Sequence, residues 1–228
     1  MDTEYYILES GKKEGPFTGQ ELMDRPLEPD DLVVQPLQTQ GTEAHLLPEF
    51  KEYFINEGIY YPTPENTSSF WLRLPAFIID SIIVVFTTEL LALLFFPAFM
   101  ARLQGIFTMN FLMDPKIQEN LLKYRTELLI IQVAIFTATV LYHSLCESSR
   151  MRGSVGKYIF GLAVVDHLGY ALTFGHAFFR NIGKIIYDII SFVVGPLAFL
   201  AYLKILWSYR HQGIHDQISG CFIVKKNK

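Results

Sequence analysis

The sequence predicts a mainly α-helical membrane protein: a helical bundle of three to four membrane helices with a small cytoplasmic β-hairpin, preceded by a small α+β soluble domain. Half of the 228 residues are hydrophobic and only 18% are charged, which is little charge for a soluble protein of this length. The apolar residues concentrate in 74–100, 128–145 and 185–207. Each run is long enough to cross a bilayer, because ~20 helical residues at ~1.5 Å per residue span the ~30 Å hydrocarbon core.

Residues 1–69 read as ordinary soluble sequence, which places a soluble domain at 1–58, a linker at 59–69 and a membrane domain at 70–226. The run 5–8 is β-prone and a turn follows it. Thr18 and Glu21 have the spacing of a capping box, so a short helix is expected to begin near residue 19. A second strand is expected at 32–34.

In this order, Tyr5-Tyr6, Gly15-Pro16-Phe17 and Leu22 resemble a GYF-like domain of the GYF_2 type, although the two tryptophans of the chain lie outside this segment. Relatives of that family bind proline-rich peptides on an aromatic surface. The resemblance therefore implies a protein partner, with Tyr5, Tyr6 and Phe17 as its binding surface. The residues themselves leave a second interpretation open, in which the three aromatic rings form the core of a very small domain.

The first membrane helix is expected at about 71–100. Arg73 and Asp80 lie seven residues apart on it, so both project from one face. An ionised carboxylate at this depth costs several kcal/mol or more, which makes Asp80 a candidate functional residue. We expect this face to contact other helices and not lipid.

A second membrane helix is expected at about 125–147, with Gln132, Thr139 and His143 on one face. The basic loop that follows it favours the cytoplasm, and an acidic N-terminus without a basic signal sequence agrees. The runs 162–165 and 170–173 flank turn residues and predict a hairpin. The N-terminal domain is then cytoplasmic.

The last apolar region has two interpretations. It crosses once, or Gly195-Pro196 divides it into a helical hairpin of about 175–194 and 196–209. Basic residues near the C-terminus favour the hairpin, which would let 222–224 return and pair near Val164. Lys184 and Asp188 lie one turn apart on its first arm and suit a mutual ion pair.

Three spaced motifs resemble the RDD family of integral membrane proteins, which is named for one arginine and two aspartates. They are Arg73-x-x-Ala76-x-x-x-Asp80, the loop from Ser154 to Gly169 with Arg180 after it, and His215-Asp216-x-x-Ser219-Gly220. Asp216 then corresponds to the second aspartate, while Cys221 stands where the family usually has threonine. Membrane transport is the role that the resemblance implies.

We expect the charged residues of the membrane domain to meet in one buried network, with His143 as an accessory. Its members are Arg73, Asp80, Lys184, Asp188 and Asp216. In one interpretation the basic groups neutralise the carboxylates and fix the helices. In the other, Asp80 binds a proton or small cation.

The sequence predicts no catalysis, because it carries no nucleophile–base signature, phosphate loop or zinc-protease motif. No cofactor or metal site is expected, since the pair His211 and His215 lacks further ligands. A net charge of −4 argues against nucleic acid. Two functions remain: transport of a small ion or solute, or a membrane-anchored adaptor. Either function predicts a multi-pass protein of the inner (cytoplasmic) membrane that contacts lipid. A homo-oligomer is a further expectation.

Overall fold

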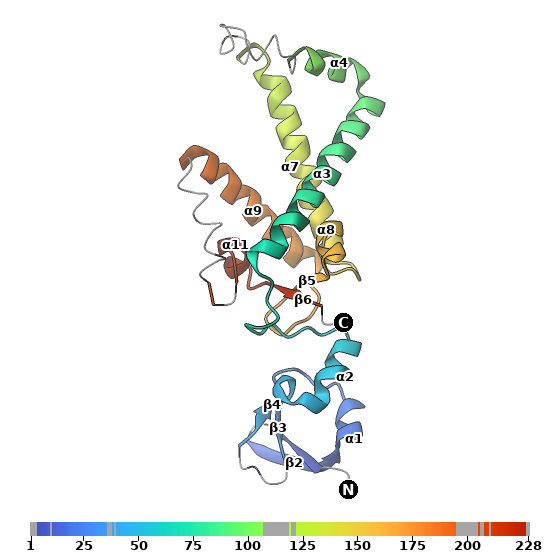
Figure 1. Ribbon diagram of the computed structural model, residues 1–228, viewed down its shortest axis with the longest axis vertical. Coiled ribbons are helices and arrows are strands. Elements are labelled where there is room, and N and C mark those ends of the chain that lie inside the picture. Colours follow the sequence, from blue (N-terminus) through green and yellow to red (C-terminus); the bar gives the residue numbers. More distant parts are fainter. Residues whose placement is uncertain are drawn as a thin grey trace.

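The computed structural model describes residues 4–9, 11–35, 38, 40–106, 119, 122–194, 205, 208, 209 and 211–226. The chain is elongated (Figure 1). A small head formed by the N-terminal residues lies at one end, a layer of short elements follows it, and two long helices diverge toward the other end.

The head is a four-stranded antiparallel sheet with helices packed against it. Its strand order is β2 (Lys12–Thr18), β1 (Glu4–Glu9), β3 (Leu32–Val34) and β4 (Thr42–Glu43). The helices are α1 (Gly19–Met23), two 3-10 turns (Ala44–Leu46 and Pro48–Phe50) and α2 (Lys51–Asn56). The predicted strands are confirmed. So is the capping box, in which the Thr18 hydroxyl accepts from the Glu21 amide and the Glu21 carboxylate accepts from the Thr18 amide.

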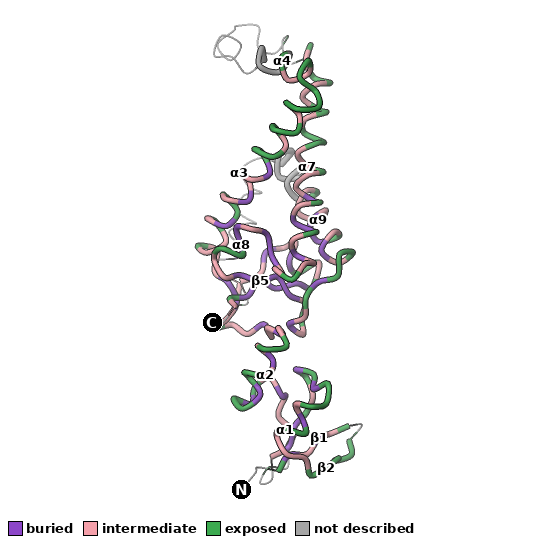
Figure 2. Tube along the Cα trace, turned by 90° about the vertical axis from the view of Figure 1, so that its right-hand side faces the viewer, coloured by how far each residue is buried: buried purple, intermediate pink, exposed green. Residues whose placement is uncertain are grey.

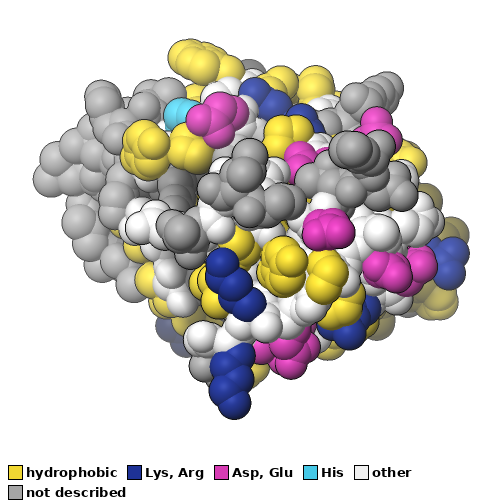
Figure 3. Space-filling model, turned by 90° about the horizontal axis from the view of Figure 1, so that it is seen from below, with side chains coloured by type: hydrophobic (Ala, Val, Ile, Leu, Met, Phe, Trp, Pro, Cys, Tyr) yellow, Lys and Arg dark blue, Asp and Glu magenta, His cyan; other side chains and the backbone are white. Residues whose placement is uncertain are grey.

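The head has its own small core, in which Leu22, Val33 and Phe50 are almost fully buried. Seen from below in Figure 3, acidic and basic side chains are interspersed around hydrophobic ones.

The two long helices are α3 (Phe70–Phe95) and α7 (Arg125–Glu147), and both are long and apolar enough to cross a membrane. The prediction of one helix over about 71–100 is wrong at its end. The chain leaves helical geometry at Phe96, and a separate helix α4 (Pro97–Ile106) begins at the next residue. Pro97 explains the break, because proline donates no backbone hydrogen bond and disfavours helical geometry in the residue before it.

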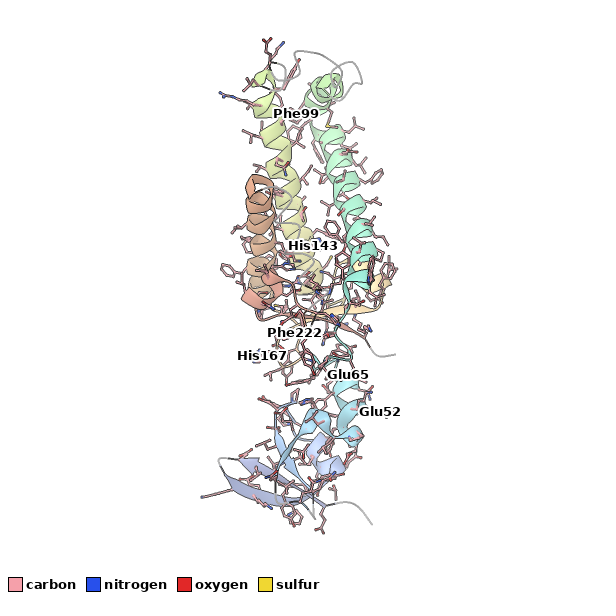
Figure 4. All side chains as sticks on the ribbon, turned by 60° about the vertical axis from the view of Figure 1, so that its left-hand side comes forward. Glu52, Glu65, Phe99, His143, His167 and Phe222 are labelled. Carbon is pink, nitrogen blue, oxygen red and sulfur yellow. The ribbon has the colours of Figure 1, made fainter. Side chains whose placement is uncertain are left out.

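Between the head and the long helices lie α8 (Val155–Ile159), β5 (Leu162–Val165), α11 (Ile214–Ile218) and β6 (Phe222–Lys225). Helix α9 (Phe174–Val194) begins at this layer and packs along α7 (Figure 4). Strand β5 pairs with β6 in antiparallel register, with Val164 opposite Ile223. The predicted return of 222–224 is therefore confirmed. The predicted hairpin with 170–173 is reduced to one bridge between Val165 and Ala171.

The pairing of β5 with β6 brings the chain back to the end at which it enters α3. The Ser68 amide donates to the Ile223 carbonyl at 2.7 Å, and Thr67 forms a bridge with Val224. The start of α3, the end of α7, the start of α9 and β6 therefore lie at one level (Figure 1). The first predicted arm, 175–194, is present as α9, whereas the arm at 196–209 falls mostly outside the described residues.

Buried and exposed residues occupy different parts of the chain (Figure 2). Buried residues gather in the head and in the layer of short elements, while the far halves of α3 and α7 are mostly exposed and apolar. An open apolar groove of about 1190 Å³ lies between α3, α4 and α7. Apolar surface of this extent is typical of helices that contact lipid or another membrane helix.

The head is attached to this layer by backbone and aromatic contacts. The Tyr60 amide donates to the Gly169 carbonyl at 3.0 Å, and Tyr170 packs against the head core. A Cβ atom at Gly169 would lie 2.6 Å from the Tyr61 amide nitrogen, so only glycine allows this approach. The segment predicted as a linker therefore forms part of a contact surface.

Candidate functional site

Glu147, the last residue of α7, is a charged residue whose side chain is fully enclosed. Both of its carboxylate oxygens accept from Arg180 Nη1 on α9, at 2.9 Å each. Lys157 Nζ on α8 and Asn181 Nδ2 also donate to it, the latter at 3.0 Å. Lys184 Nζ lies 3.7 Å away. A carboxylate with this many donors remains ionised without water.

Arg180 also binds a second buried carboxylate. Its Nη2 donates to Asp216 on α11, while Arg73 Nη1 on α3 donates to the other Asp216 oxygen at 2.9 Å. Burial alone raises the pKa of Asp216, but His215, Arg180 and Arg73 outweigh it and hold that pKa well below its usual range. The resulting chain of ion pairs runs Glu147, Arg180, Asp216, Arg73 and links α7, α9, α11 and α3.

Asp80 is bound differently. One of its oxygens accepts from the Tyr142 hydroxyl and the Gly156 amide, at 2.8 Å each, and the other accepts from the Ser154 hydroxyl. Ser154 and Gly156 form the N-terminus of α8, where exposed amides and the helix dipole favour a carboxylate. A Cβ atom at Gly156 would lie 2.2 Å from the Ala76 carbonyl, so glycine is needed for α8 to pack against α3.

The predicted single network is thus divided in two. Arg73, Asp216 and Lys184 meet around Arg180 and Glu147, whereas the hydrogen bonds of Asp80 come from hydroxyl and amide groups and not from Arg73. The expectation of a basic partner for Asp80 is wrong, because Arg73 turns instead toward Asp216. The side chain of Asp188 lies outside the described part of α9, so its predicted pair with Lys184 stays a prediction.

His143 lies one helical turn from Glu147 on α7 and is buried. Figure 4 shows it between the level of Phe222 in β6 and that of Phe99 in α4. Among the described residues its Nδ1 atom has no hydrogen-bond partner. Lys184 keeps 22% of its side chain exposed and donates to Asn181 Oδ1 at 2.7 Å. A polar group therefore begins at the partly exposed side chain of Lys184 and continues along α7 through Glu147 and His143.

The three aromatic residues predicted to bind peptide do not form one surface. Tyr5 is buried in the head core, and its hydroxyl donates to Glu49. Phe17 is paired with Tyr5 across the strands and packs against the same core, with Arg25 over its ring. Tyr6 points to the opposite face, because successive strand residues alternate. For Tyr5 and Phe17 the core interpretation is correct.

Sequence reasoning named Arg180 only as part of a resemblance and did not include Glu147, Lys157, Ser154 or Tyr142 in the site. A signal for Glu147 was present, since it continues the face of Thr139 and His143 at the next spacing of four. We interpreted it as the end of a helix. No spacing rule pointed to Ser154, because its contact with Asp80 joins segments 74 residues apart.

Together, the fold and the buried ion pairs define a mostly helical protein, with two candidate membrane-spanning helices in the part of the chain that the structure describes. Residues 67–220 match the RDD family, and the chain belongs to it. It is also similar to an uncharacterized protein, YxaI, of Bacillus subtilis (strain 168), with 30% identity over 163 residues that cover 71% of this chain and 99% of that protein. No solved structure matches the chain.

We predict that Asp80 acts as a hydrogen-bond acceptor, not as a required charge. Asp80→Asn keeps an acceptor oxygen, and the Ser154 hydroxyl can reverse to accept from the new amide, so thermal unfolding in detergent should change little. Asp80→Ala leaves three donors unpaired and should lower the free energy of unfolding by about 3 kcal/mol or more. Ser81→Ala is the control, because it removes from the next residue a hydroxyl that bonds the Phe77 carbonyl of its own helix. Equal losses in the Asn and Ala variants would contradict this role.

A pH dependence follows from His215, which lies outside the candidate spans. Burial lowers its pKa to about 4, although Asp216 opposes the shift. The fold therefore keeps His215 neutral. The folding stability that depends on neutral His215 is fully present above about pH 6.5 and is lost as the pH falls toward 4. His215→Gln should remove up to roughly 3 kcal/mol of this acid destabilisation, measured as melting temperature against pH. His167→Gln, at an exposed turn, should leave the wild-type curve unchanged; superimposable curves for all three proteins would show the shift to be absent.

Proposed function

We propose that this protein moves a small ion or solute across the membrane, with the polar group of His143, Glu147 and Lys184 at the head end of its pathway. The observation that carries the proposal is the burial of ionisable groups at the end of apolar helices. Charged residues in such positions are expensive and usually mark ion or proton pathways. Asp80 then has a supporting role, because its hydrogen bonds fasten α8 to α3 and α7.

His143 is the residue best suited to exchange a proton or to contact a passing solute. It is buried, its Nδ1 has no partner in the described chain, and it lies next to the carboxylate of the next turn. Lys184 connects this group with the exterior, since its side chain is partly exposed while its ammonium lies 3.7 Å from Glu147.

The proposed topology is multi-pass with the head in the cytoplasm. The pairing of β5 with β6 supports it, since a two-stranded sheet cannot straddle a bilayer, and the chain between them must return to the side it left. The basic residues Arg150 and Arg152 lie at this same end, in agreement with the bias of cytoplasmic loops. The apolar groove between α3 and α7 supports a homo-oligomer, because a second copy would cover it.

The transport proposal predicts that His143→Phe abolishes flux while the protein stays folded. Phenylalanine keeps an aromatic ring at this position and removes no described Nδ1 hydrogen bond. We therefore expect at least a tenfold loss of flux in proteoliposomes assayed with a panel of cations and a pH gradient. Thr139→Val is the matched control, because among the described residues this hydroxyl bonds the Ile135 carbonyl of its own helix. Wild-type flux no greater than that of empty vesicles would end the proposal.

The alternative function is a membrane-anchored adaptor, favoured by an apolar stripe on the outer face of the head sheet. Tyr6 and Leu8 of β1 share this face with Leu32 of β3, which is 41% exposed. An extended proline-rich peptide would fit such a stripe.

If the head is an adaptor, Leu32→Ser should weaken the binding of proline-rich peptides at least tenfold, measured by titration calorimetry. Leu46→Ser, at another exposed leucine of the head, should bind as the wild type does. Peptide binding that is undetectable in the wild-type protein, or equal in both variants, would exclude this surface.

A further inference from the structure

The buried ion pairs hold more positive than negative charge. In the described part of the chain, Arg73, Lys157, Arg180 and Lys184 all lie within ion-pair distance of Glu147 or Asp216. Four basic groups around two carboxylates leave a formal surplus of positive charge among these described ion pairs. Most of this charge is buried, and it favours an anion because uncompensated buried charge is costly.

Two of these basic groups also retain unused donors. Arg180 Nε and Arg73 Nη2 are buried and have no hydrogen-bond partner in the part of the chain that the structure describes. Arg180 is almost fully enclosed, with 1% of its surface exposed. A buried donor without a partner costs about 1–3 kcal/mol, so an acceptor supplied by a ligand would be stabilising.

Arg180 borders a cavity of about 60 Å³ between α9 and α11, which has room for a group of a few heavy atoms. Gly183, His215 and Ser219 contribute to its wall. Phe179 and Ile218 flank it, and their side chains are among the most exposed apolar ones of the chain, at 75% and 82%.

If α3 and α7 cross a bilayer, the cavity lies at the depth of the phospholipid headgroups. Arg73 is four residues into α3 and Glu147 is the last residue of α7, so the ion pairs mark the ends of both candidate spans. An exposed phenylalanine and isoleucine at this depth suit the adjoining glycerol and acyl groups.

We propose that the cavity between α9 and α11 binds the phosphate group of a net anionic headgroup, with the guanidinium of Arg180 as the basic group at its wall. The surplus charge of the ion-pair cluster makes a headgroup with net negative charge preferable to a zwitterionic one. The phosphate belongs either to a phospholipid or to a soluble phosphate ester, and the two sources are distinguished by the ligands in the test. Glu147 and Lys184 contribute to both proposals, but the binding test below does not depend on transport.

The test uses the full chain in a neutral detergent and measures binding by native mass spectrometry and by the shift in melting temperature. The ligands are phosphatidylglycerol, phosphatidylcholine and glycerol 3-phosphate. Gly183→Leu fills the cavity, and nothing lies within 4 Å of a Cβ atom there. Gly175→Leu, at an equally open position of α9, is the matched control.

We expect phosphatidylglycerol to bind at least tenfold more tightly than phosphatidylcholine, Gly183→Leu to lose at least tenfold of that affinity, and Gly175→Leu to keep it. Competition by glycerol 3-phosphate would assign the site to soluble phosphate esters, whereas binding of lipid alone would assign it to the membrane. Equal binding of both lipids, or equal affinity of wild type and Gly183→Leu, would overturn the proposal.

A second pair of variants covers the case in which Gly183→Leu does not fold. Ile218→Glu places a negative charge at the mouth of the cavity on an exposed residue of α11, and it should repel the anionic headgroup. Ile159→Glu makes the same change on α8, at a position that is 60% exposed. Loss of phosphatidylglycerol binding in the first variant alone would support the site, and equal effects in both would contradict it.

Discussion

The arrangement of the membrane domain depends on the guanidinium of Arg180, which binds Glu147 and Asp216 at the same time. Because Asp216 in turn binds Arg73, four elements that lie far apart in the sequence are held at one level. Removing one partner of a buried ion pair typically costs 3–5 kcal/mol, since the other charge remains without compensation. The far halves of α3 and α7 lack such contacts among the described residues, and they diverge.

Asp80 adds a second, independent connection. Its carboxylate is positioned at the N-terminus of α8, and Gly156 allows the backbones of α8 and α3 to approach closely. Lys157, the next residue of α8, binds Glu147. Helix α8 therefore contacts both buried carboxylates: its Gly156 amide binds Asp80, and its Lys157 ammonium binds Glu147. This short helix links the Asp80 hydrogen bonds to the ion-pair cluster without placing Asp80 inside that cluster.

The polar groups lie at the end of α3 and α7 that is nearest the head, and this placement connects structure with function. A pathway that begins at Lys184 and passes Glu147 and His143 would open on the side of the head, and a headgroup site beside Arg180 would bring lipid to the same level. The head is fixed to this layer by Tyr60 and Tyr170, so a partner bound to its outer face would lie close to the membrane surface.

The sequence by itself determined the apolar helices, the capping box of the head and the candidate charges Arg73 and Asp80, which follow from local spacing, chain length and residue chemistry. Asp216 was named from the family resemblance, and the return of 222–224 belonged to one of two open interpretations. Only the tertiary structure decided which charges pair. Spacing along one helix places Arg73 and Asp80 on the same face, but the choice of partner depends on Arg180, Ser154 and Gly156, which approach from elements that are distant in the sequence. Burial likewise decided that Tyr5 and Phe17 pack in a core, because exposure depends on what the rest of the chain covers.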